Sequence, residues 1–518
     1  MTGQLAPFFH RVMHSLGAVT AMSDDALTIH LGSIGVLVQL PEDDAHWGDA
    51  GDLLLSLLAR LFPNLSVSSG PRSRELPSLA ALNPALAPVD PAKQRIISVR
   101  LGSRSIDTPA INVTASGWNV LVDRAPLEST PPYPLAALAA ACLAAAEVFR
   151  DAFAEQLQSP RRGVQPGAFN IITAGPETDE VPPPTSGLNV GTVHLAGAGA
   201  VGQACVFALR AMSVRGRLIV VDPETIDLSN LQRYVLSDLD DIGKPKVDVV
   251  EQHLGNNGWE VIRVQSAWGA DPLSAPLREC VLVALDSAAD RLGVAAGLHK
   301  IILNAWTQPA DLGWSRHRNP PTGEPCLACL YLPQRQQPSE DEQIAAALKQ
   351  HRLRVLGYLT TRVPIGQPLP FVTQVAEIPA PDDAEGWLQQ PLIDDLVALQ
   401  IVAPTDRPRW ATLPLTRLYQ EGVCGDALLR ENLGTVPSEY TVPLAAQSAM
   451  AGVLLATSLL ATRDPAIRPH LPEQVEARLD LLAGLPQELL RPRLPTPGCL
   501  CQDPLVGEFI AQHDQTDR

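Results

Sequence analysis

The sequence predicts an α/β protein whose second half is doubly wound around a mostly parallel sheet. Short apolar runs alternate with helical segments between residues 188 and 304. The connections between them are short, as in a sheet covered by helices on both faces. A Gly197-x-Gly199-x-x-Gly202 turn joins the first apolar run to an alanine-rich helix. That arrangement is typical of a Rossmann-like βα unit, in which glycines let the backbone approach a phosphate at the helix N-terminus.

The elements of the second half follow from local patterns. Apolar runs bounded by polar residues predict strands, and helical periodicity predicts helices. The predicted strands are Val193–Leu195, Leu218–Val221, Val261–Gln265, Val281–Leu285 and Ile301–Asn304, and the predicted helices are Val201–Met212, Pro245–Leu254 and Ala288–His299. Further on, Pro443–Leu460 predicts a closely packed helix rich in small residues. In such a sheet the ligand binds at the carboxyl ends of the strands.

The first half also has α/β character. Strands are predicted within Ile96–Ser103 and Ala110–Arg124, Leu27–Leu40 is strand-like, and a long helix is predicted over Leu135–Phe149. The half has no complete glycine fingerprint, because residues 32–35 (GSIG) are only a weak remnant of one. We therefore expect no nucleotide site in this half.

Proline-rich stretches divide the chain into segments. Residues 1–175 form the N-terminal half and 176–187 a proline-rich linker. The Rossmann-like domain occupies 188–332 and resumes over 412–480, with an inserted domain over 333–411. Residues 481–518 form a proline-rich tail.

Composition excludes several functions. A chain of 518 residues is too long for a single core. Its net charge of −17 argues against a nucleic-acid partner. The N-terminus lacks the layout of a signal peptide, and the most apolar helices are too short to span a membrane, so we expect a cytoplasmic protein. The eight cysteines are then expected to be thiols, metal ligands or a nucleophile rather than disulfides.

Five polar residues follow the predicted strand ends in order: Asp222, Asn230, Arg233, Lys246 and Asp286. Taken singly, Lys246 and Arg233 could be ordinary surface charges, and Asp286 could cap a helix. Together they would gather at the carboxyl edge of the sheet. An NAD site needs only the glycines and Asp222, whereas a reaction that splits a triphosphate also needs cations.

The segments GAGAVG (197–202), VDPETIDLSNLQR (221–233), DIGKPK (241–246) and VALDSAADR (283–291) resemble the motifs of ubiquitin-activating-type enzymes, the ThiF/MoeB/HesA superfamily. The resemblance covers roughly residues 191–304 and implies MgATP-dependent adenylation of the C-terminal carboxylate of a ubiquitin-like protein. By this resemblance, the phosphate loop would contain Gly197, Gly199 and Gly202, and Asp222 would bind the ribose. The triphosphate would be bound by Asn230, Arg233 and Lys246, and Asp286 would bind Mg²⁺. Arg291 would instead make a structural contact within its helix.

The first half resembles the degenerate, inactive pseudo-adenylation half of larger superfamily members, so that the chain would be a monomeric pseudo-dimer. Smaller members are homodimers in which the partner subunit supplies an arginine to the active site. Both arrangements stay open at this point. Arg11 is the nearest candidate for such an arginine in the first half.

The cysteine pairs Cys326-x-x-Cys329 and Cys499-x-Cys501 supply four thiols, the number that a structural Zn²⁺ requires. The first pair has a common zinc-binding spacing, whereas the second is tighter than usual. Bound zinc would attach the tail to the domain. The alternative is four unrelated reduced thiols.

Cys424 lies in a glycine-flanked turn after the inserted domain, before a predicted helix. A helix N-terminus lowers a thiol pKa, whereas the nearby Glu421 and Asp426 would oppose thiolate formation. It is either a small buried turn residue or the nucleophile that takes the modifier as a thioester.

The sequence therefore favours a bacterial-type activating enzyme that adenylates a ubiquitin-like protein and passes it to a conjugating enzyme. Some such conjugation systems act in antiphage defence. Three alternatives remain: a sulfur-carrier adenylyltransferase for thiamine or molybdopterin synthesis, an NAD-dependent oxidoreductase, and a non-catalytic scaffold of two degenerate halves.

Overall fold

The computed structural model covers the whole chain and describes most of it. The described residues are 20, 22–42, 44–69, 79, 82–83, 85–102, 110–127, 130–157, 166–255, 257–271, 273, 277–308, 311–319, 323–332, 344–345, 348, 350–361, 363–369, 391–398, 402–415, 444–483, 485, 489–508 and 510. Arg11 and Cys424 lie outside the described residues.

The chain forms two compact units. The larger contains Met1–Leu332 and Pro443–Arg518, and the smaller contains Pro333–Val442. The smaller unit begins where the sequence predicts the insertion to begin, but it extends beyond the predicted end at residue 411. Leu415 packs into the core of the smaller unit, together with Trp410 and Tyr358. Its described helices are α11 (Arg352–Thr361), α13 (Leu392–Ala398) and α14 (Arg407–Trp410).

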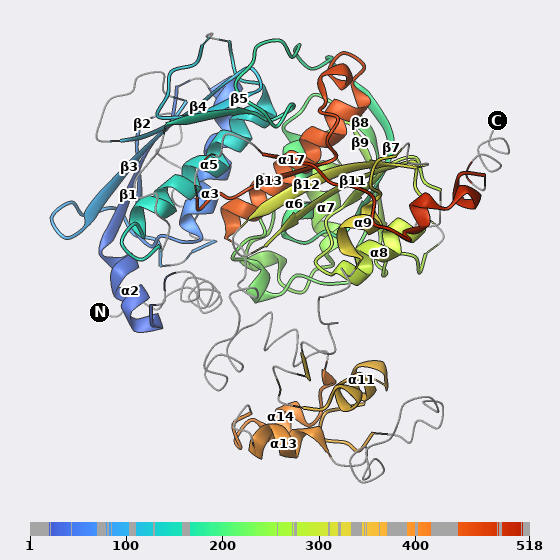
Figure 1. Ribbon diagram of the computed structural model, residues 1–518. Helices are drawn as coiled ribbons and strands as arrows, with labels where there is room; N and C mark the ends of the chain where they lie inside the picture. Colours follow the sequence, from blue (N-terminus) through green and yellow to red (C-terminus); the bar gives the residue numbers. More distant parts are fainter. Residues whose placement is uncertain are drawn as a thin grey trace. The chain divides into compact units, whose positions relative to one another are not determined.

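The first sheet of the larger unit has six strands in the order β2-β1-β3-β4-β5-β6 (Figure 1). Its strands are β1 (Ile34–Gln39), β2 (Leu65–Ser69), β3 (Arg95–Leu101), β4 (Ile111–Ser116), β5 (Asn119–Val122) and β6 (Gly167–Asn170). The first four are parallel, and β5 and β6 are antiparallel. The predicted strand region Ala110–Arg124 is therefore a hairpin, which turns at Gly117 with φ +53°.

The strand prediction for Leu27–Leu40 is wrong over its first part. Residues Asp24–Gly32 form the helix α2, and the strand begins only at Ile34. The Ser23 side chain caps this helix by accepting from the Ala26 N–H, and two acidic residues occupy the first turn. These features favour a helix N-terminus and outweigh the strand-like apolar pattern.

The second sheet has eight strands in the order β14-β13-β12-β11-β10-β7-β8-β9. Its strands are β7 (Asn189–Ala196), β8 (Arg215–Val221), β9 (Trp259–Val264), β10 (Val281–Val283), β11 (Ile301–Thr307), β12 (Leu312–Arg318), β13 (Glu476–Leu479) and β14 (Leu490–Arg491). The parallel strands β7 to β11 confirm the five strands predicted from apolar runs. The remaining three are antiparallel, so the sheet is mixed.

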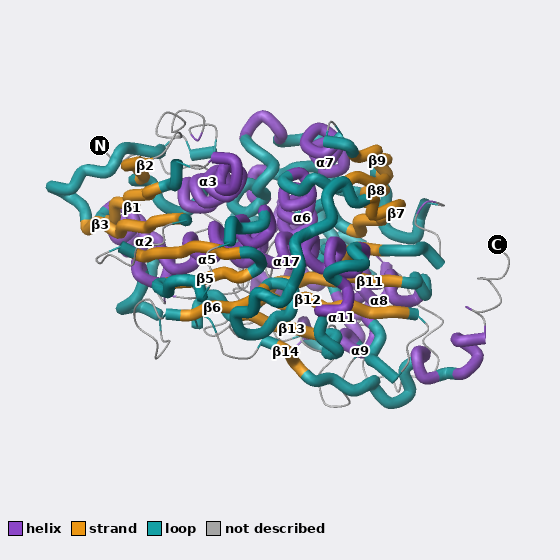
Figure 2. The backbone as a smooth tube through the Cα atoms, turned by 90° about the horizontal axis from the view of Figure 1, so that it is seen from above, coloured by secondary structure: helices purple, strands orange, loops and turns teal. Residues whose placement is uncertain are grey.

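The two sheets share one topology. The order β2-β1-β3-β4-β5-β6 repeats as β8-β7-β10-β11-β12-β13. A helix follows the first strand of each half, α3 (Asp44–Ala59) and α6 (Ala200–Arg210). A 19-residue helix follows β5 and its counterpart β12, namely α5 (Pro134–Ala152) and α17 (Ala445–Arg463). These last two helices pack side by side, and one hydrophobic core runs through both halves (Figure 2).

The other helices described here are α7 (Lys246–Leu254), α8 (Ala288–Ala296) and α9 (Leu327–Tyr331). By length and composition alone, α17 could cross a membrane. However, 89% of its most apolar window is buried inside the fold, which is typical of a core helix. It packs against α6 and α5.

We predict that Gly452→Ala destabilises the larger unit. A Cβ atom at this position of α17 would lie 2.6 Å from the Val201 carbonyl oxygen and 2.5 Å from the Ala204 Cβ, both on α6. Overpacking of this kind costs about 1–3 kcal/mol of unfolding free energy. Chemical denaturation followed by circular dichroism measures it.

Gly293→Ala in α8 is the matched control, because nothing lies within 4 Å of a Cβ placed there. This substitution should stabilise by up to about 1 kcal/mol through helix propensity. Equal effects of the two substitutions would contradict the close helix contact.

Candidate active site

The glycine loop connects β7 to α6 at the carboxyl edge of the second sheet. Gly197 has φ +93°, and a Cβ there would lie 2.7 Å from the Ala284 carbonyl oxygen. A Cβ on Gly202 would lie 2.2 Å from the carbonyl oxygen of Gly197. Gly199 is the N-cap of α6 and has no capping side chain. The loop therefore requires glycine at two positions for packing, and it leaves the first-turn N–H groups of α6 available to an anion.

Asp222 follows β8 and binds the glycine loop. Its buried carboxylate accepts from the Ala198 N–H at 2.7 Å and from the Glu224 N–H at 2.9 Å. Burial raises the pKa of Asp222, whereas the charge of Lys246 and these two hydrogen bonds oppose the rise. In this structure Asp222 holds the loop backbone. Its predicted contact with ribose stays a prediction.

The segment after Asp222 carries the other predicted residues. Asn230 ends a short 3₁₀ helix, and its Oδ1 accepts from the Asp227 N–H at 2.9 Å. Arg233 is half-buried, and its Nε has no hydrogen-bond partner among the residues that the structure describes. A guanidinium nitrogen of this kind is suited to bind an anionic ligand.

Lys246 begins α7, and its side chain is only 5% exposed. Its Nζ forms an ion pair with Glu224 and lies 5.3 Å from the centroid of the Tyr234 ring. Burial alone would lower the pKa of Lys246, but the charges of Tyr234, Asp222 and Glu224 outweigh it, so the net pKa is raised. The lysine therefore stays protonated and is a fixed cation at this edge.

Asp286 lies just beyond β10, whose Val283 pairs with Ala196 of β7. The sheet thus places Asp286 at the same edge as the glycine loop. It is exposed, and the N-cap of α8 is Ser287 rather than Asp286. The carboxylate is therefore open to Mg²⁺, as predicted for it, although no contact here tests that role.

Arg291 has a structural role, as the resemblance implied. Its buried guanidinium donates to the carbonyl oxygens of Leu285 and Ala305 and to Asn304 Oδ1. It thereby ties the end of β10 to β11 beneath α8.

Sequence reasoning missed three residues. Glu224 and Tyr234 contact Lys246. Both lie close in sequence to a predicted site residue, Asp222 or Arg233, and this proximity could have identified them as candidates. Arg60 of the first half is fully buried and donates to the carbonyl oxygens of Leu231 and Ser237. No motif marks Arg60.

The four predicted zinc ligands form one cluster. The Sγ atoms of Cys326, Cys329, Cys499 and Cys501 all lie within 4.8 Å of one another. The closer separations are 3.5 Å for Cys326 with Cys499, 3.6 Å for Cys329 with Cys501, and 3.9 Å within the first pair. Four sulfur atoms at ~2.3 Å from a tetrahedral zinc lie about 3.8 Å apart. The cluster is therefore consistent with a zinc site that joins the tail to α9.

The thiols of the cluster interact with one another. The hydrogen bond between the first two lowers the pKa of Cys329 and raises that of Cys326, so the pair shares a proton when no metal is bound. The Cys329 Sγ also accepts from the Thr496 N–H at 3.3 Å. Zinc held here would neutralise thiolate charge and fix residues 496–501 against the domain.

A glycine loop at a helix N-terminus, with the buried cation Lys246 at the same edge of a doubly wound sheet, is typical of a nucleotide-using α/β enzyme. The chain matches the ThiF family over residues 185–467, more than half of its length, and it belongs to that family. It is thus an ATP-dependent adenylyltransferase that acts on the C-terminus of a protein or peptide. This assignment takes the place of the NAD-dependent and non-catalytic alternatives.

A relative of similar length and two solved structures also match the chain. The chain is 32% identical over 527 residues to "Uncharacterized protein y4jF" of Sinorhizobium fredii (strain NBRC 101917 / NGR234), covering 96% of this chain and 95% of that protein. The crystal structure of PaaA is 20% identical over 25% of this chain and 42% of that chain, with a TM-score of 0.21. E. coli MccB with ATP is 21% identical over 30% and 47%, with a TM-score of 0.25. The chain thus matches less than half the length of these solved structures.

We predict that the protein contains one zinc ion per chain and that Cys501→Ser loses most of it. Removal of one thiolate leaves three ligands, so metal affinity falls and the melting temperature decreases. Inductively coupled plasma mass spectrometry and thermal unfolding measure the two effects.

Cys142→Ala is the control, because Cys142 is buried among alanines of α5, away from the cluster. It should retain the zinc. A wild-type chain that neither contains zinc after purification nor takes it up would contradict the assignment.

Proposed function

We propose that the chain activates a ubiquitin-like protein. It adenylates the C-terminal carboxylate with MgATP, forms a thioester on Cys424 and transfers the modifier to a conjugating enzyme. The observation that supports the proposal is the buried Lys246, which lies against the Tyr234 ring and interacts electrostatically with Asp222, the residue that holds the glycine loop before α6.

The chemistry of adenylation needs these groups. A carboxylate oxygen attacks the α-phosphorus, the bond from this phosphorus to the bridging oxygen of the β-phosphate breaks, and pyrophosphate leaves with the electron pair. The attacking carboxylate is already ionised at neutral pH, so no general base is required. Cations must instead offset the repulsion between two anions and stabilise the leaving pyrophosphate.

The chain's own residues divide this work. The N–H groups at the start of α6 and the side chains of Arg233, Lys246 and Asn230 would bind and orient the triphosphate. Asp286 would hold Mg²⁺, which supplies further charge neutralisation when bound. Asp222 fixes the loop that presents the α6 N-terminus.

We propose that the first half is inactive and serves as the built-in partner of the second, as a pseudo-dimer. At the carboxyl edge of its sheet, a Cβ on Gly102 would lie 2.9 Å from the Trp47 ring. The indole is buried and packs where the strand β3 ends. A bulky side chain at this edge leaves no counterpart of the open glycine loop.

The thioester step is proposed from sequence position. Cys424 lies in the chain between α14 and α17, and the four other non-core thiols belong to the metal cluster. We extend the proposal to a bacterial cytoplasmic conjugation pathway, of the kind found in antiphage systems. The second candidate is a sulfur-carrier adenylyltransferase, which shares the cations and the zinc-type cluster but yields a thiocarboxylate.

We predict that Lys246→Ala lowers adenylation about 100-fold, since removal of one preorganised charge from such a site costs roughly that factor. The assay is ATP–pyrophosphate exchange dependent on a panel of ubiquitin-like proteins with free C-termini. Lys93→Ala is the matched control, because Lys93 is an exposed lysine of the first half paired with Asp90. Exchange that is supported equally by modifiers with an amidated C-terminus would contradict the proposed substrate group.

We predict that Cys424→Ala retains exchange but loses a modifier adduct that dithiothreitol cleaves. Adenylation precedes thioester formation and does not need the thiol. Non-reducing gel electrophoresis detects the adduct, with Cys142→Ala as the control. An adduct that persists in Cys424→Ala would rule out this nucleophile, and a thiocarboxylate product found by mass spectrometry would favour the sulfur-carrier alternative.

A further inference from the structure

The segment Leu231–Ser237 carries residues of the ATP site and contacts the first half of the chain. Arg60, the residue after α3, is fully buried and reaches this segment. Its Nη2 donates to the Ser237 carbonyl oxygen at 3.1 Å, and its Nη1 donates to that of Leu231. These two carbonyl groups bracket Arg233 and Tyr234. One guanidinium therefore fixes both ends of the stretch that presents these side chains.

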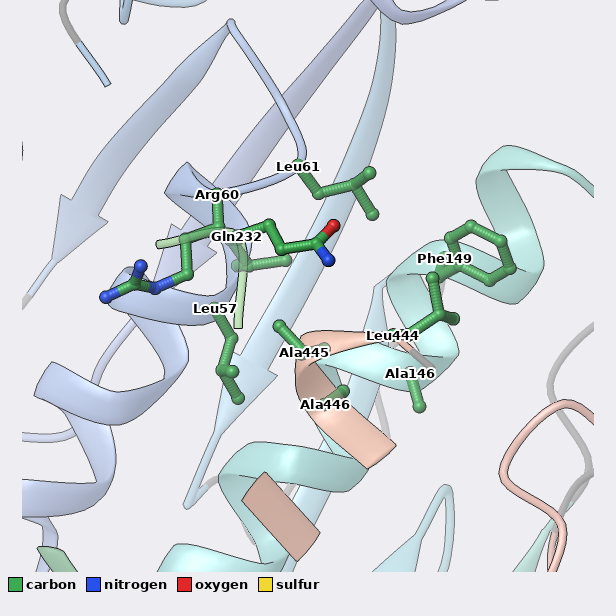
Figure 3. Close-up of a pocket in the computed structure, with 11 residues that line it drawn as sticks. Leu57, Arg60, Leu61, Ala146, Phe149, Gln232, Leu444, Ala445 and Ala446 are labelled. Carbon is green, nitrogen blue, oxygen red and sulfur yellow. The ribbon is translucent and has the colours of Figure 1, made fainter. Parts of the chain in front are cut away.

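A second contact anchors the same segment. The Gln232 side chain lines a pocket together with Leu57, Leu61 and Phe149 of the first half and with the first residues of α17 (Figure 3). Leu231 beside it is only 1% exposed. The backbone at these two residues is thus packed into the first half rather than held only by its own domain.

The second half holds the segment from its other side. Gln203 of α6 accepts from the Leu236 N–H at 3.3 Å and from Ser237 Oγ at 3.0 Å. Within the described residues, the Arg233 Nε forms no hydrogen bond that would fix this side chain independently. The direction of Arg233 therefore depends on the backbone that Arg60 and Gln203 hold.

Arg60 keeps its charge in this position. Burial lowers the pKa of Arg60 to about 10, and the charge of Asp238 opposes that fall, so the guanidinium is protonated at neutral pH. Its third donor, Nε, donates to Ser56 Oγ at 3.4 Å, one turn earlier in the chain. The planar guanidinium of arginine has several N–H donors and can bind two carbonyl groups at once, whereas the single ammonium group of lysine cannot hold both in this way.

We infer that Arg60 is a positioning residue of the adenylation site, through which the first half orients Arg233 and the Tyr234–Lys246 pair toward the triphosphate. Arg60 touches no substrate in this scheme. The inference depends on the proposed use of those residues at the phosphates. It gives the first half a direct role in ATP binding, although that half offers no glycine loop of its own.

The test measures the binding of magnesium α,β-methylene-ATP to the full chain by isothermal titration calorimetry. Arg60→Met keeps the length of the side chain and should weaken binding about tenfold. Arg60→Lys should weaken it about threefold, because one ammonium cannot hold both carbonyl groups. Unchanged affinity in Arg60→Lys or in a folded Arg60→Met would overturn the inference.

Arg150→Met is the matched control. Arg150 is also buried in the first half, but its ion-pair partner Glu147 lies on the same helix, α5. This variant should melt at a lower temperature and bind the analogue with wild-type affinity. A tenfold loss in Arg150→Met as well would show that Arg60 contributes only to the stability of the first half.

A double-mutant cycle separates positioning from general destabilisation. If Arg60 acts through Arg233, Arg60→Met should weaken binding less than threefold in an Arg233→Ala chain. A full tenfold effect in that chain would contradict the inference. The ATP analogue binds without an acceptor protein, so the double-mutant cycle tests the role of Arg60 independently of the protein substrate. If no ubiquitin-like protein supports pyrophosphate exchange, that result counts against the proposed function and leaves the test of Arg60 valid.

Discussion

The buried carboxylate of Asp222 connects the parts of the site that must act together. One oxygen accepts from the glycine loop at the Ala198 N–H, and the other accepts from the Glu224 N–H. Glu224 in turn contacts Lys246, whose backbone N–H donates to the Glu224 carbonyl oxygen. Loss of this carboxylate would leave the buried Ala198 N–H without its partner, which costs more than the hydrogen bond contributes, and it would also release the Glu224 N–H. The position of the phosphate loop relative to the cations therefore depends on this residue.

The two halves share a strand order but differ at the carboxyl edge of the sheet. In the second half, Gly197 brings the backbone so close to Ala284 that no Cβ could fit between them. In the first half, the corresponding edge is occupied by the buried Trp47 beside Gly102. The two edges differ in the volume of the side chain at this point. In the second half, glycine leaves the N-terminus of α6 open to an anion, whereas in the first half the indole of Trp47 makes the edge part of the core.

Local sequence patterns predicted those elements whose burial leaves a compositional signal in the segment itself. The five parallel strands are rich in apolar residues, and α6 and α17 are dense in small apolar residues. The α2 region was wrongly predicted as a strand because its apolar residues alternate. Its N-cap at Ser23 instead favours a helix. The four cysteines were recognisable because they occur as two closely spaced pairs, and the structure brings their four sulfur atoms together.

Arg60 could not be predicted, for a physical reason. Its partners are the backbone carbonyl groups of Leu231 and Ser237, which every residue type possesses, and they lie far away in the chain. No side-chain pattern marks a contact of that kind; only the packing of two halves into one core brings it about. The contact between Glu224 and Lys246 is different, because it joins two side chains that stand within the recognised motif segments. The ion pair with Lys246 joins an immobile, buried cation to a carboxylate that is 67% exposed. An exposed partner can return to water at little cost, whereas the buried lysine cannot. An incoming phosphate would therefore displace Glu224 and meet a cation already in place.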